Sequence, residues 1–192
     1  MARSSWRWVR PSATESTAWL WAKSLLNALL FFALFVVALP WLAHGLVSVP
    51  VPMPAPIPVL GGGLLFFGGL FTWLRCLDVF SRRGRGTPFP LDAPRHLVTS
   101  GPFAVVRNPI MAAELSVIWG EAFYLASLGT LLYAALASAL AHFLVIRVEE
   151  PELRQRFGEA YEHYCRRVPR WLPGPPRRRG GPPAPPAGSA RR

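Results

Sequence analysis

The chain has 192 residues, of which 52% are hydrophobic and only 16% are charged, and its formal net charge is +11. The length suits one domain of ordinary size, and the composition is typical of a membrane protein. The basic residues fall within 1–23, 75–107 and 147–192, where they flank uncharged apolar segments and form no continuous basic face, which argues against nucleic acid as a partner. Two cysteines and four histidines show neither a disulfide framework nor metal-ligand spacing, so we expect no metal.

The N-terminal half predicts an arm, a span, a loop and a second span. Residues 1–23 mix basic residues with tryptophans and are expected to form an interfacial arm, because indoles favour the headgroup region. The apolar run over 24–45 exceeds a signal-peptide core and is close to the roughly 20 residues that cross a bilayer. Prolines at every second position from Pro50 to Pro58 predict an extended loop. Residues 59–79 predict a second span, with glycines that allow close helix packing.

The middle of the chain predicts a long polar loop followed by a helical hairpin. The stretch over 81–107 is broken by glycine and proline, and loops of this length are often functional. The apolar run after it is too long for one span and predicts two, 109–128 and 130–146. Apart from tyrosine, its ionisable side chains are Glu114, Glu121 and His142. Each either serves a function, facing the substrate, or forms a hydrogen bond between helices.

The C-terminal region predicts an amphipathic helix outside the membrane and a tail. Apolar residues recur at helical spacing between Arg147 and Arg170, and Pro151 predicts a break or kink at the membrane boundary. The proline- and arginine-rich residues 173–192 are expected to be disordered. Because Lys and Arg remain on the cytoplasmic side, this charge map predicts four spans with both termini cytoplasmic. The juxtamembrane arginines also favour anionic lipid headgroups.

The order of motifs resembles the integral-membrane methyltransferases that include isoprenylcysteine carboxyl methyltransferases and phospholipid N-methyltransferases, above all their small bacterial members. The resemblance covers about residues 84–172 and rests on motifs before and after the hairpin: Gly101-Pro102-Phe103, Arg107-Asn108-Pro109, Glu149-Glu150, Tyr161, Tyr164 and Arg167-Val168-Pro169. It implies an all-α polytopic protein of the bacterial inner membrane, with residues 24–172 as the methyltransferase-like domain. It also implies S-adenosylmethionine as methyl donor and an acceptor resembling an isoprenylcysteine carboxylate or a phospholipid amine.

The resemblance assigns site residues in two groups. Those expected to bind the cofactor are Val98, Gly101, Pro102, Phe103, Arg107, Asn108, Pro109, Glu149, Glu150, Tyr161, Tyr164 and Arg167, with Arg107 and Glu150 as the catalytic pair. The hairpin is expected to return Glu149 and Glu150 to the side of the membrane on which Arg107 lies. Carboxylates suit the ribose hydroxyls and the amino group of the cofactor, and a guanidinium suits its carboxylate. Without the resemblance, the carboxylates could be interface charges, Arg107 could contact lipid headgroups, and the tyrosines could pack the amphipathic helix.

The acceptor is expected to meet Met111, Glu114, Glu121 and His142. A carboxylate acceptor needs only positioning, whereas a protonated amine needs a base such as one of the last three. Many relatives have His where Asn108 stands and Tyr where Met111 stands, which places a direct role of that tyrosine in doubt and allows altered substrate choice or lost activity. The alternative function is a non-catalytic membrane adaptor that uses the basic, proline-rich tail to bind partners.

Overall fold

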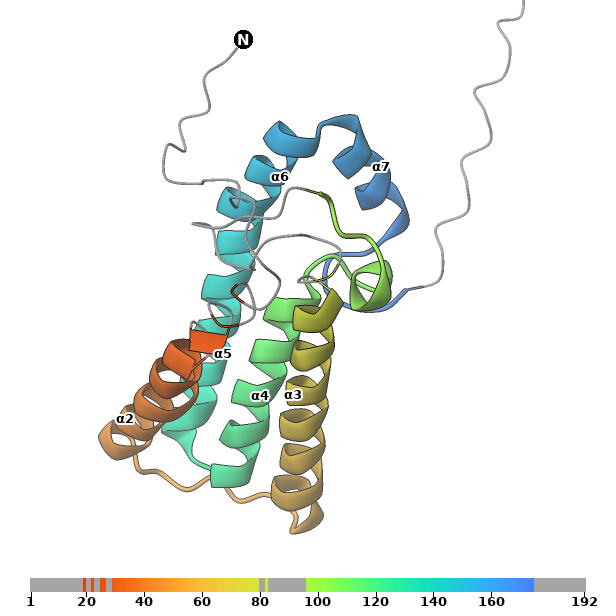
Figure 1. Cartoon of the computed structure of the whole chain (residues 1–192). Coiled ribbons are helices and arrows are strands. Elements are labelled where there is room, and N and C mark those ends of the chain that lie inside the picture. Colours follow the sequence, from red (N-terminus) through yellow and green to blue (C-terminus); the bar gives the residue numbers. More distant parts are fainter. Residues whose placement is uncertain are drawn as a thin grey trace, which may run out of the picture.

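The structure is a computed structural model that describes residues 29–79 and 96–174, together with Trp19, Ala22, Leu25, Leu26 and Arg82. All named elements in this part of the chain are helical (Figure 1). The all-α class predicted from the sequence is therefore confirmed. Most of the predicted N-terminal arm, most of the loop before His96, and the tail after Gly174 lie outside the described residues.

Three helices are long and apolar enough to cross a membrane, and they cover 29–46, 57–79 and 128–157. The first contains the π-helical segment η1 (Phe32–Ala38) and α2 (Leu39–Leu46), and the second contains the π-helical η2 (Ile57–Gly61) and α3 (Gly62–Val79). The predicted hairpin is formed by α4 (Pro109–Leu125) and α5 (Leu128–Leu144). Since α4 has 17 residues, it is about 26 Å long, and a crossing by α4 remains a prediction.

The third long helix extends beyond the membrane. From α5 the chain passes through a π-helical turn, η6 (Val145–Glu149), into α6 (Glu150–Phe157) without leaving the helix. Of the break or kink predicted at Pro151, the break was wrong, because widening the preceding turn relieves the clash between a proline ring and the carbonyl four residues earlier. These 30 residues span about 45 Å, against a hydrocarbon core of about 30 Å.

The change of direction occurs instead at Gly158, whose φ is +51°. There the chain turns into α7 (Glu159–Arg167), so the predicted amphipathic helix is two short helices. Figure 1 shows α6 continuing past the ends of α3 and α4, with α7 folding back toward them. We call this the polar end of the molecule.

Three glycines bring α3 and α4 into close contact. A Cβ atom added at Gly120 would lie 2.5 Å from the backbone nitrogen of Phe66, and one at Gly69 would lie 2.7 Å from the carbonyl oxygen of Ala113. Gly62 also lies against α4, because a Cβ atom added there would be 2.8 Å from the Gly120 carbonyl oxygen. The close packing predicted for the second span is therefore real, although Gly63 and Gly68 have open space around them.

Opposite the polar end, the proline-rich loop closes onto the turn of the hairpin. The backbone N–H of Val51 donates to Ala126 O at 2.8 Å, and the N–H of Leu128 donates to Val49 O at 2.9 Å. The Ser127 hydroxyl adds a bond to Val47 O at 3.2 Å. The loop is extended as predicted up to Pro54, but helix η2 already begins at Ile57, where prolines are tolerated in a first turn.

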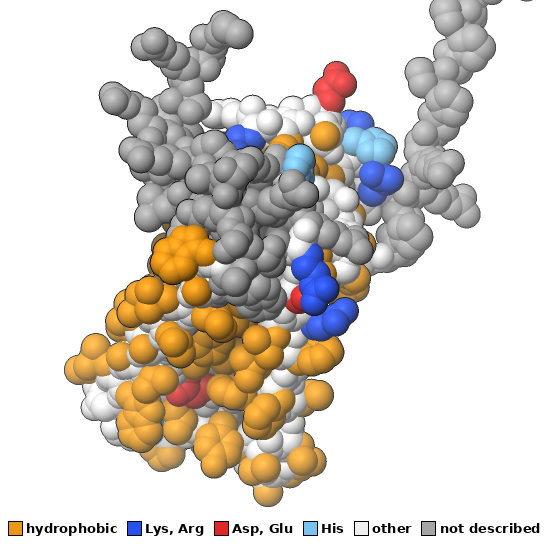
Figure 2. Space-filling model, viewed as in Figure 1, with side chains coloured by type: hydrophobic (Ala, Val, Ile, Leu, Met, Phe, Trp, Pro, Cys, Tyr) orange, Lys and Arg blue, Asp and Glu red, His pale blue; other side chains and the backbone are white. Residues whose placement is uncertain are grey.

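The polar end carries a short 3-10 turn, η5 (Gly101–Ala104), in front of α4. Figure 2 shows that hydrophobic side chains cover the helices of the membrane part, whereas Lys, Arg and His side chains gather toward the polar end. Within the membrane part, the largest core cluster joins Val36, Val117, Ile118, Ala122 and Ala134. The protein is thus a polytopic helical membrane protein, and its basic side chains gather toward the polar end.

Candidate functional site

Glu150 is the centre of a buried cluster of charged side chains at the polar end. Its side chain is 2% exposed and receives three guanidinium groups. Arg170 binds both carboxylate oxygens, with Nε 2.6 Å from Oε1 and Nη2 3.1 Å from Oε2. Arg107 Nη1 lies 3.0 Å from Oε1, and Arg154 Nη2 lies 3.4 Å from Oε2. The hydrogen bond with Glu150 raises the pKa of the Arg170 guanidinium.

Arg107 occupies the junction between the loop and α4. Its side chain is 10% exposed, and its Nη1 also donates to Cys165 Sγ at 2.8 Å. Its Nε has no hydrogen-bond partner among the described residues. The hairpin was predicted to bring Arg107 to Glu149 and Glu150, and it places Arg107 directly on Glu150. Because a buried N–H is costly when unpaired, this donor is available to a ligand.

Residues 168–172, here called the strap, cross the start of α4. The backbone N–H of Arg107 donates to Pro169 O at 2.8 Å, and that of Asn108 donates to Arg170 O at 3.3 Å. The Asn108 side chain adds a bond from Nδ2 to the same carbonyl at 3.4 Å. Asn108 therefore holds the strap in place with both its backbone and its amide side chain.

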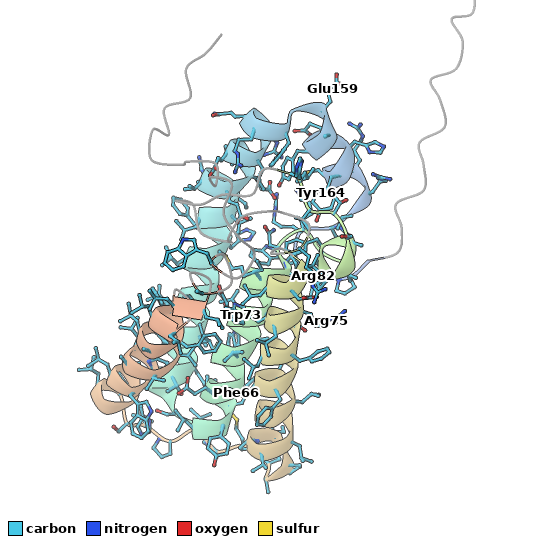
Figure 3. All side chains as sticks on the ribbon, in the orientation of Figure 1. Phe66, Trp73, Arg75, Arg82, Glu159 and Tyr164 are labelled. Carbon is cyan, nitrogen blue, oxygen red and sulfur yellow. The ribbon has the colours of Figure 1, made fainter. Side chains whose placement is uncertain are left out.

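Aromatic side chains form the floor beside this cluster. Val98, Phe103 and Cys76 pack together as one buried group, and the Tyr164 hydroxyl donates to Phe103 O at 2.6 Å. The rings of Tyr161 and Tyr164 lie 6.1 Å apart. Burial raises the pKa of both phenols, so both remain neutral hydrogen-bond donors. In Figure 3, Tyr164 lies at the polar end, whereas Trp73 lies farther along α3 in the membrane part.

Gly101 and Pro102 shape the turn that carries Phe103 into this floor. The φ of Gly101 is +63°, in the left-handed region, and a Cβ there would lie 3.0 Å from Val79 Cγ2. Pro109 opens α4, where its missing N–H leaves no hydrogen bond unmade. These three predicted residues thus set the path of the backbone around the cluster.

Glu149 and Arg167 do not join the Glu150 cluster. Glu149 is exposed, yet it is close enough to Glu114 and Tyr164 for electrostatic interaction. Arg167 is exposed on α7, and the arginine that meets the carboxylate is Arg170.

Met111, Glu114 and Glu121 form a stripe along one face of α4, since their positions fall within about 80° at 100° per residue. Glu114 Oε1 accepts a hydrogen bond from Trp73 Nε1 at 3.2 Å. Glu121 Oε2 is buried without a partner among the described residues. His142 is not part of this stripe, because its Nδ1 accepts a hydrogen bond from Trp171 Nε1 at 3.0 Å in the strap.

Five residues of this region were not predicted: Arg154, Arg170, Cys165, Trp73 and Trp171. Arg170 directly follows the Arg167-Val168-Pro169 motif, so extending that motif by one residue would have included it. The sequence holds no comparable signal for Cys165 or the two indoles, which depend on how the helices are rotated.

The cluster has the chemistry to bind a zwitterion. A carboxylate ligand is recognised by guanidinium groups, which Arg107 and Arg170 supply, and an ammonium group is recognised by a carboxylate, which Glu150 supplies. An α-amino acid carries both groups on one carbon. The described residues contain no group of three or more His, Cys, Asp or Glu side chains placed to hold a metal ion.

Comparison with known proteins gives two findings. A family model described as phospholipid methyltransferase matches residues 57–160, which is more than half of the chain. The chain is also 39% identical over 77 residues to the cobalt-zinc-cadmium resistance protein CzcN of Cupriavidus metallidurans. That alignment covers 40% of this chain and 35% of the relative, so the chain spans about a third of the curated protein it matches.

Proposed function

This chain belongs to the phospholipid methyltransferase family, and on that basis we propose that it transfers a methyl group from S-adenosylmethionine to a lipophilic or small membrane-accessible acceptor. The observation that carries this proposal is the Glu150 cluster, in which two arginines and one carboxylate meet at the polar end. The amino-acid part of S-adenosylmethionine is a zwitterion, and the cluster offers complementary charges to both of its ends.

The buried Nε of Arg107 supports the fit of this cofactor, because it is a donor with no partner among the described residues. Arg107 and Arg170 bind the carboxylate of the cofactor, and Glu150 binds its ammonium group. Val98 and Phe103 provide an apolar surface for the adenine, and Glu149 accepts hydrogen bonds from the ribose. S-adenosylmethionine supplies a methyl group that its sulfonium makes electrophilic.

The contribution of the protein to methyl transfer is orientation and exclusion of water. An in-line displacement needs the acceptor held behind the methyl group more than it needs acid or base groups. The buried tyrosines and the α4 stripe would contribute to holding the acceptor and excluding water there. Met111 and Glu114 line the acceptor side, next to Glu149.

The choice of acceptor depends on Glu114. A carboxylate acceptor, as in an isoprenylcysteine, attacks as it stands, whereas an ammonium acceptor must first lose a proton to a base. Glu114 lies on the stripe near Glu149, whereas His142 is tied to the strap. We therefore expect Glu114→Gln to abolish methylation of an amine and to spare methylation of a carboxylate, measured as transfer of a labelled methyl group to each kind of acceptor.

Calorimetry with S-adenosylhomocysteine tests the binding step on the full chain in detergent. We expect Glu150→Gln to weaken binding at least tenfold, because the ammonium group loses its counter-charge. Glu159→Gln, an exposed carboxylate on α7, is the matched control and should bind as the parent chain does. If the parent chain binds no S-adenosylhomocysteine, or Glu150→Gln binds equally well, the proposal is wrong.

The alternative is a non-catalytic membrane adaptor of the same fold. It is favoured by the fact that the site arginines already pair with Glu150 inside the protein, so the cluster is stable without a ligand. Deleting residues 175–192 separates the two functions. An enzyme keeps its binding of S-adenosylhomocysteine, whereas an adaptor that acts through its basic tail loses its partners.

The proposal places the protein in the bacterial inner membrane, with both termini in the cytoplasm. Residues 24–172 then form the enzyme domain, with the arm before it and the tail after it. The polar end faces the cytoplasm, where S-adenosylmethionine is made.

A further inference from the structure

Cys165 is a free thiol on α7 that lies against the Glu150 cluster. Arg107 Nη1 donates to its Sγ at 2.8 Å, and Arg154 and Arg170 are close enough to the sulfur for electrostatic interaction. These three guanidinium groups are the ones that surround Glu150. The thiol is half-buried, so a small solute can reach it, and the proposed methyl transfer does not use it.

The environment of Cys165 differs from that of the other cysteine. Cys76 is 0% exposed and packs against Val98 and Phe103 in an apolar group. Buried cysteines in apolar surroundings are inert, whereas reactive ones occupy partly exposed positions beside arginine or lysine, because the thiolate is the nucleophile. Cys165 therefore has the surroundings of a reactive thiol, and Cys76 has those of a structural one.

The guanidinium group of Arg107 can hold more than the thiol it now contacts. Its side chain is 10% exposed, and its Nε has no hydrogen-bond partner among the described residues. An oxygen atom added to Cys165 Sγ would lie beside this cation and accept a charge-assisted hydrogen bond. Arg107 is also the residue to which the carboxylate of the cofactor is assigned above. Oxygen on Cys165 and the cofactor would thus compete for one guanidinium group.

We propose that Cys165 is a redox-modification site, and that its oxidation by a hydroperoxide closes the cofactor site. The thiolate attacks one peroxide oxygen, so an S–O bond forms, the O–O bond breaks, and sulfur is oxidised to a sulfenic acid. The peroxide is reduced, and its second oxygen leaves as hydroxide, which takes up a proton to become water. The closure rests on the proposed function, whereas the modification itself does not.

The modification is reversible by a low-molecular-weight thiol. That thiol attacks the sulfenic sulfur, so the oxygen leaves as water and a mixed disulfide forms. A second thiol then attacks the mixed disulfide, which releases Cys165 as a thiol and the two small thiols as their disulfide. Reduction therefore returns Arg107 to the cofactor.

Hydrogen peroxide and dimedone, which traps sulfenic acids, test the modification on the full chain in detergent. Peptide mass spectrometry measures the adduct at each cysteine, and we expect it at Cys165 and scarcely at Cys76. The matched control is the double variant Cys165→Ser, His163→Cys, whose thiol is at an exposed position of α7. This position lies about 200° around the helix from Cys165, at 100° per residue. Its thiol should form the adduct severalfold more slowly, although it is more open to solvent.

Calorimetry with S-adenosylhomocysteine tests the closure of the cofactor site. Peroxide treatment should weaken binding to the parent chain severalfold, and dithiothreitol should restore it. Cys165→Ser lacks the thiol but keeps Met111 and the other residues that peroxide can oxidise. It should bind S-adenosylhomocysteine equally well before and after the treatment.

Adduct that forms no faster at Cys165 than at the thiol of the double variant overturns the proposal. Unchanged binding of S-adenosylhomocysteine by a parent chain whose Cys165 is fully oxidised overturns it too. If the untreated parent chain binds no S-adenosylhomocysteine, the proposed function fails, and the adduct rates still decide whether Cys165 is a modification site.

Discussion

Glu150 is a buried carboxylate that stays charged because three guanidinium groups surround it. Removing charges from water costs free energy that is recovered only where the geometry is good and further hydrogen bonds satisfy the remaining oxygens. Arg170 meets both conditions with two short bonds. Arg154 contributes less, since it is 43% exposed and also binds Glu162.

Arg170→Ala tests how much Arg170 contributes to the stability of the Glu150 cluster and to ligand binding. We expect the free energy of unfolding to fall by about 2 kcal/mol, the typical worth of hydrogen bonds to a charged group. Binding of S-adenosylhomocysteine should weaken as well. The measurement is thermal unfolding in detergent, with calorimetry for the binding.

The matched control is Arg167→Ala, which removes an exposed arginine three residues earlier. It should leave the free energy of unfolding and the binding of S-adenosylhomocysteine within error of the parent chain. Equal losses in the two variants would show that the contact of Arg170 with Glu150 does not explain the effect.

Tyr164→Phe removes the hydroxyl that holds the loop before α4. The bond from Tyr164 to Phe103 O is 2.6 Å long and buried, so its loss should cost about 1–3 kcal/mol of stability. Tyr124→Phe, at a residue that is 65% exposed, should change stability by less than about 0.5 kcal/mol. Unfolding curves of the two variants decide this, and a smaller loss in Tyr164→Phe than in Tyr124→Phe would contradict the role of the bond.

At the scale of helices, two of the widened turns lie just before prolines. Segments η1 and η6 precede Pro40 and Pro151, whereas Pro58 lies in the first turn of its helix, where a proline needs no such adjustment. A proline removes one N–H and pushes against the carbonyl four residues earlier, and a π turn accommodates both effects without ending the helix. Each such turn also rotates the residues after it around the helix axis.

The contact between α3 and α4 depends on glycine at a few positions. Gly120→Ala would place a Cβ 2.5 Å from Phe66 N, so the two helices must move apart. We expect a loss of about 1–3 kcal/mol in the free energy of unfolding, as for other overpacked sites. Thermal unfolding in detergent measures it.

Gly63→Ala is the control for the same change in an open position, because nothing lies within 4 Å of its added Cβ. There the better helix propensity of alanine should give a gain of about 0.5–1 kcal/mol. A loss of similar size in both variants would show that the close approach of α3 and α4 at Gly120 does not explain the effect.

At the scale of the whole molecule, the two ends carry different surfaces. The proline-rich loop meets the hairpin turn at one end, and α6, α7 and the strap form the other. The positive charges gather at the polar end (Figure 2), so we expect this end in the cytoplasm.

Cysteine labelling tests that orientation. In a Cys165→Ser background, Ala55→Cys and Glu159→Cys place thiols at exposed positions at the two ends. A membrane-impermeant maleimide should label Ala55→Cys in intact cells and Glu159→Cys only after the inner membrane is opened. Labelling of both thiols from the same side would contradict the predicted crossings.

The sequence by itself determined the helical class, the apolar segments and the loops between them, because hydropathy, charge and proline act locally along the chain. It also indicated that Arg107 meets a carboxylate some 40 residues later, since a hairpin returns the chain to the same end. Only the tertiary structure decided which carboxylate and which arginine meet. The π turn before Pro151 shifts the residues after it around the helix axis. Regular helical spacing therefore cannot tell whether Glu149 or Glu150 faces Arg107. The strap brings in Arg170 in place of Arg167, and its path depends on contacts with α4 and α5 that no local pattern records.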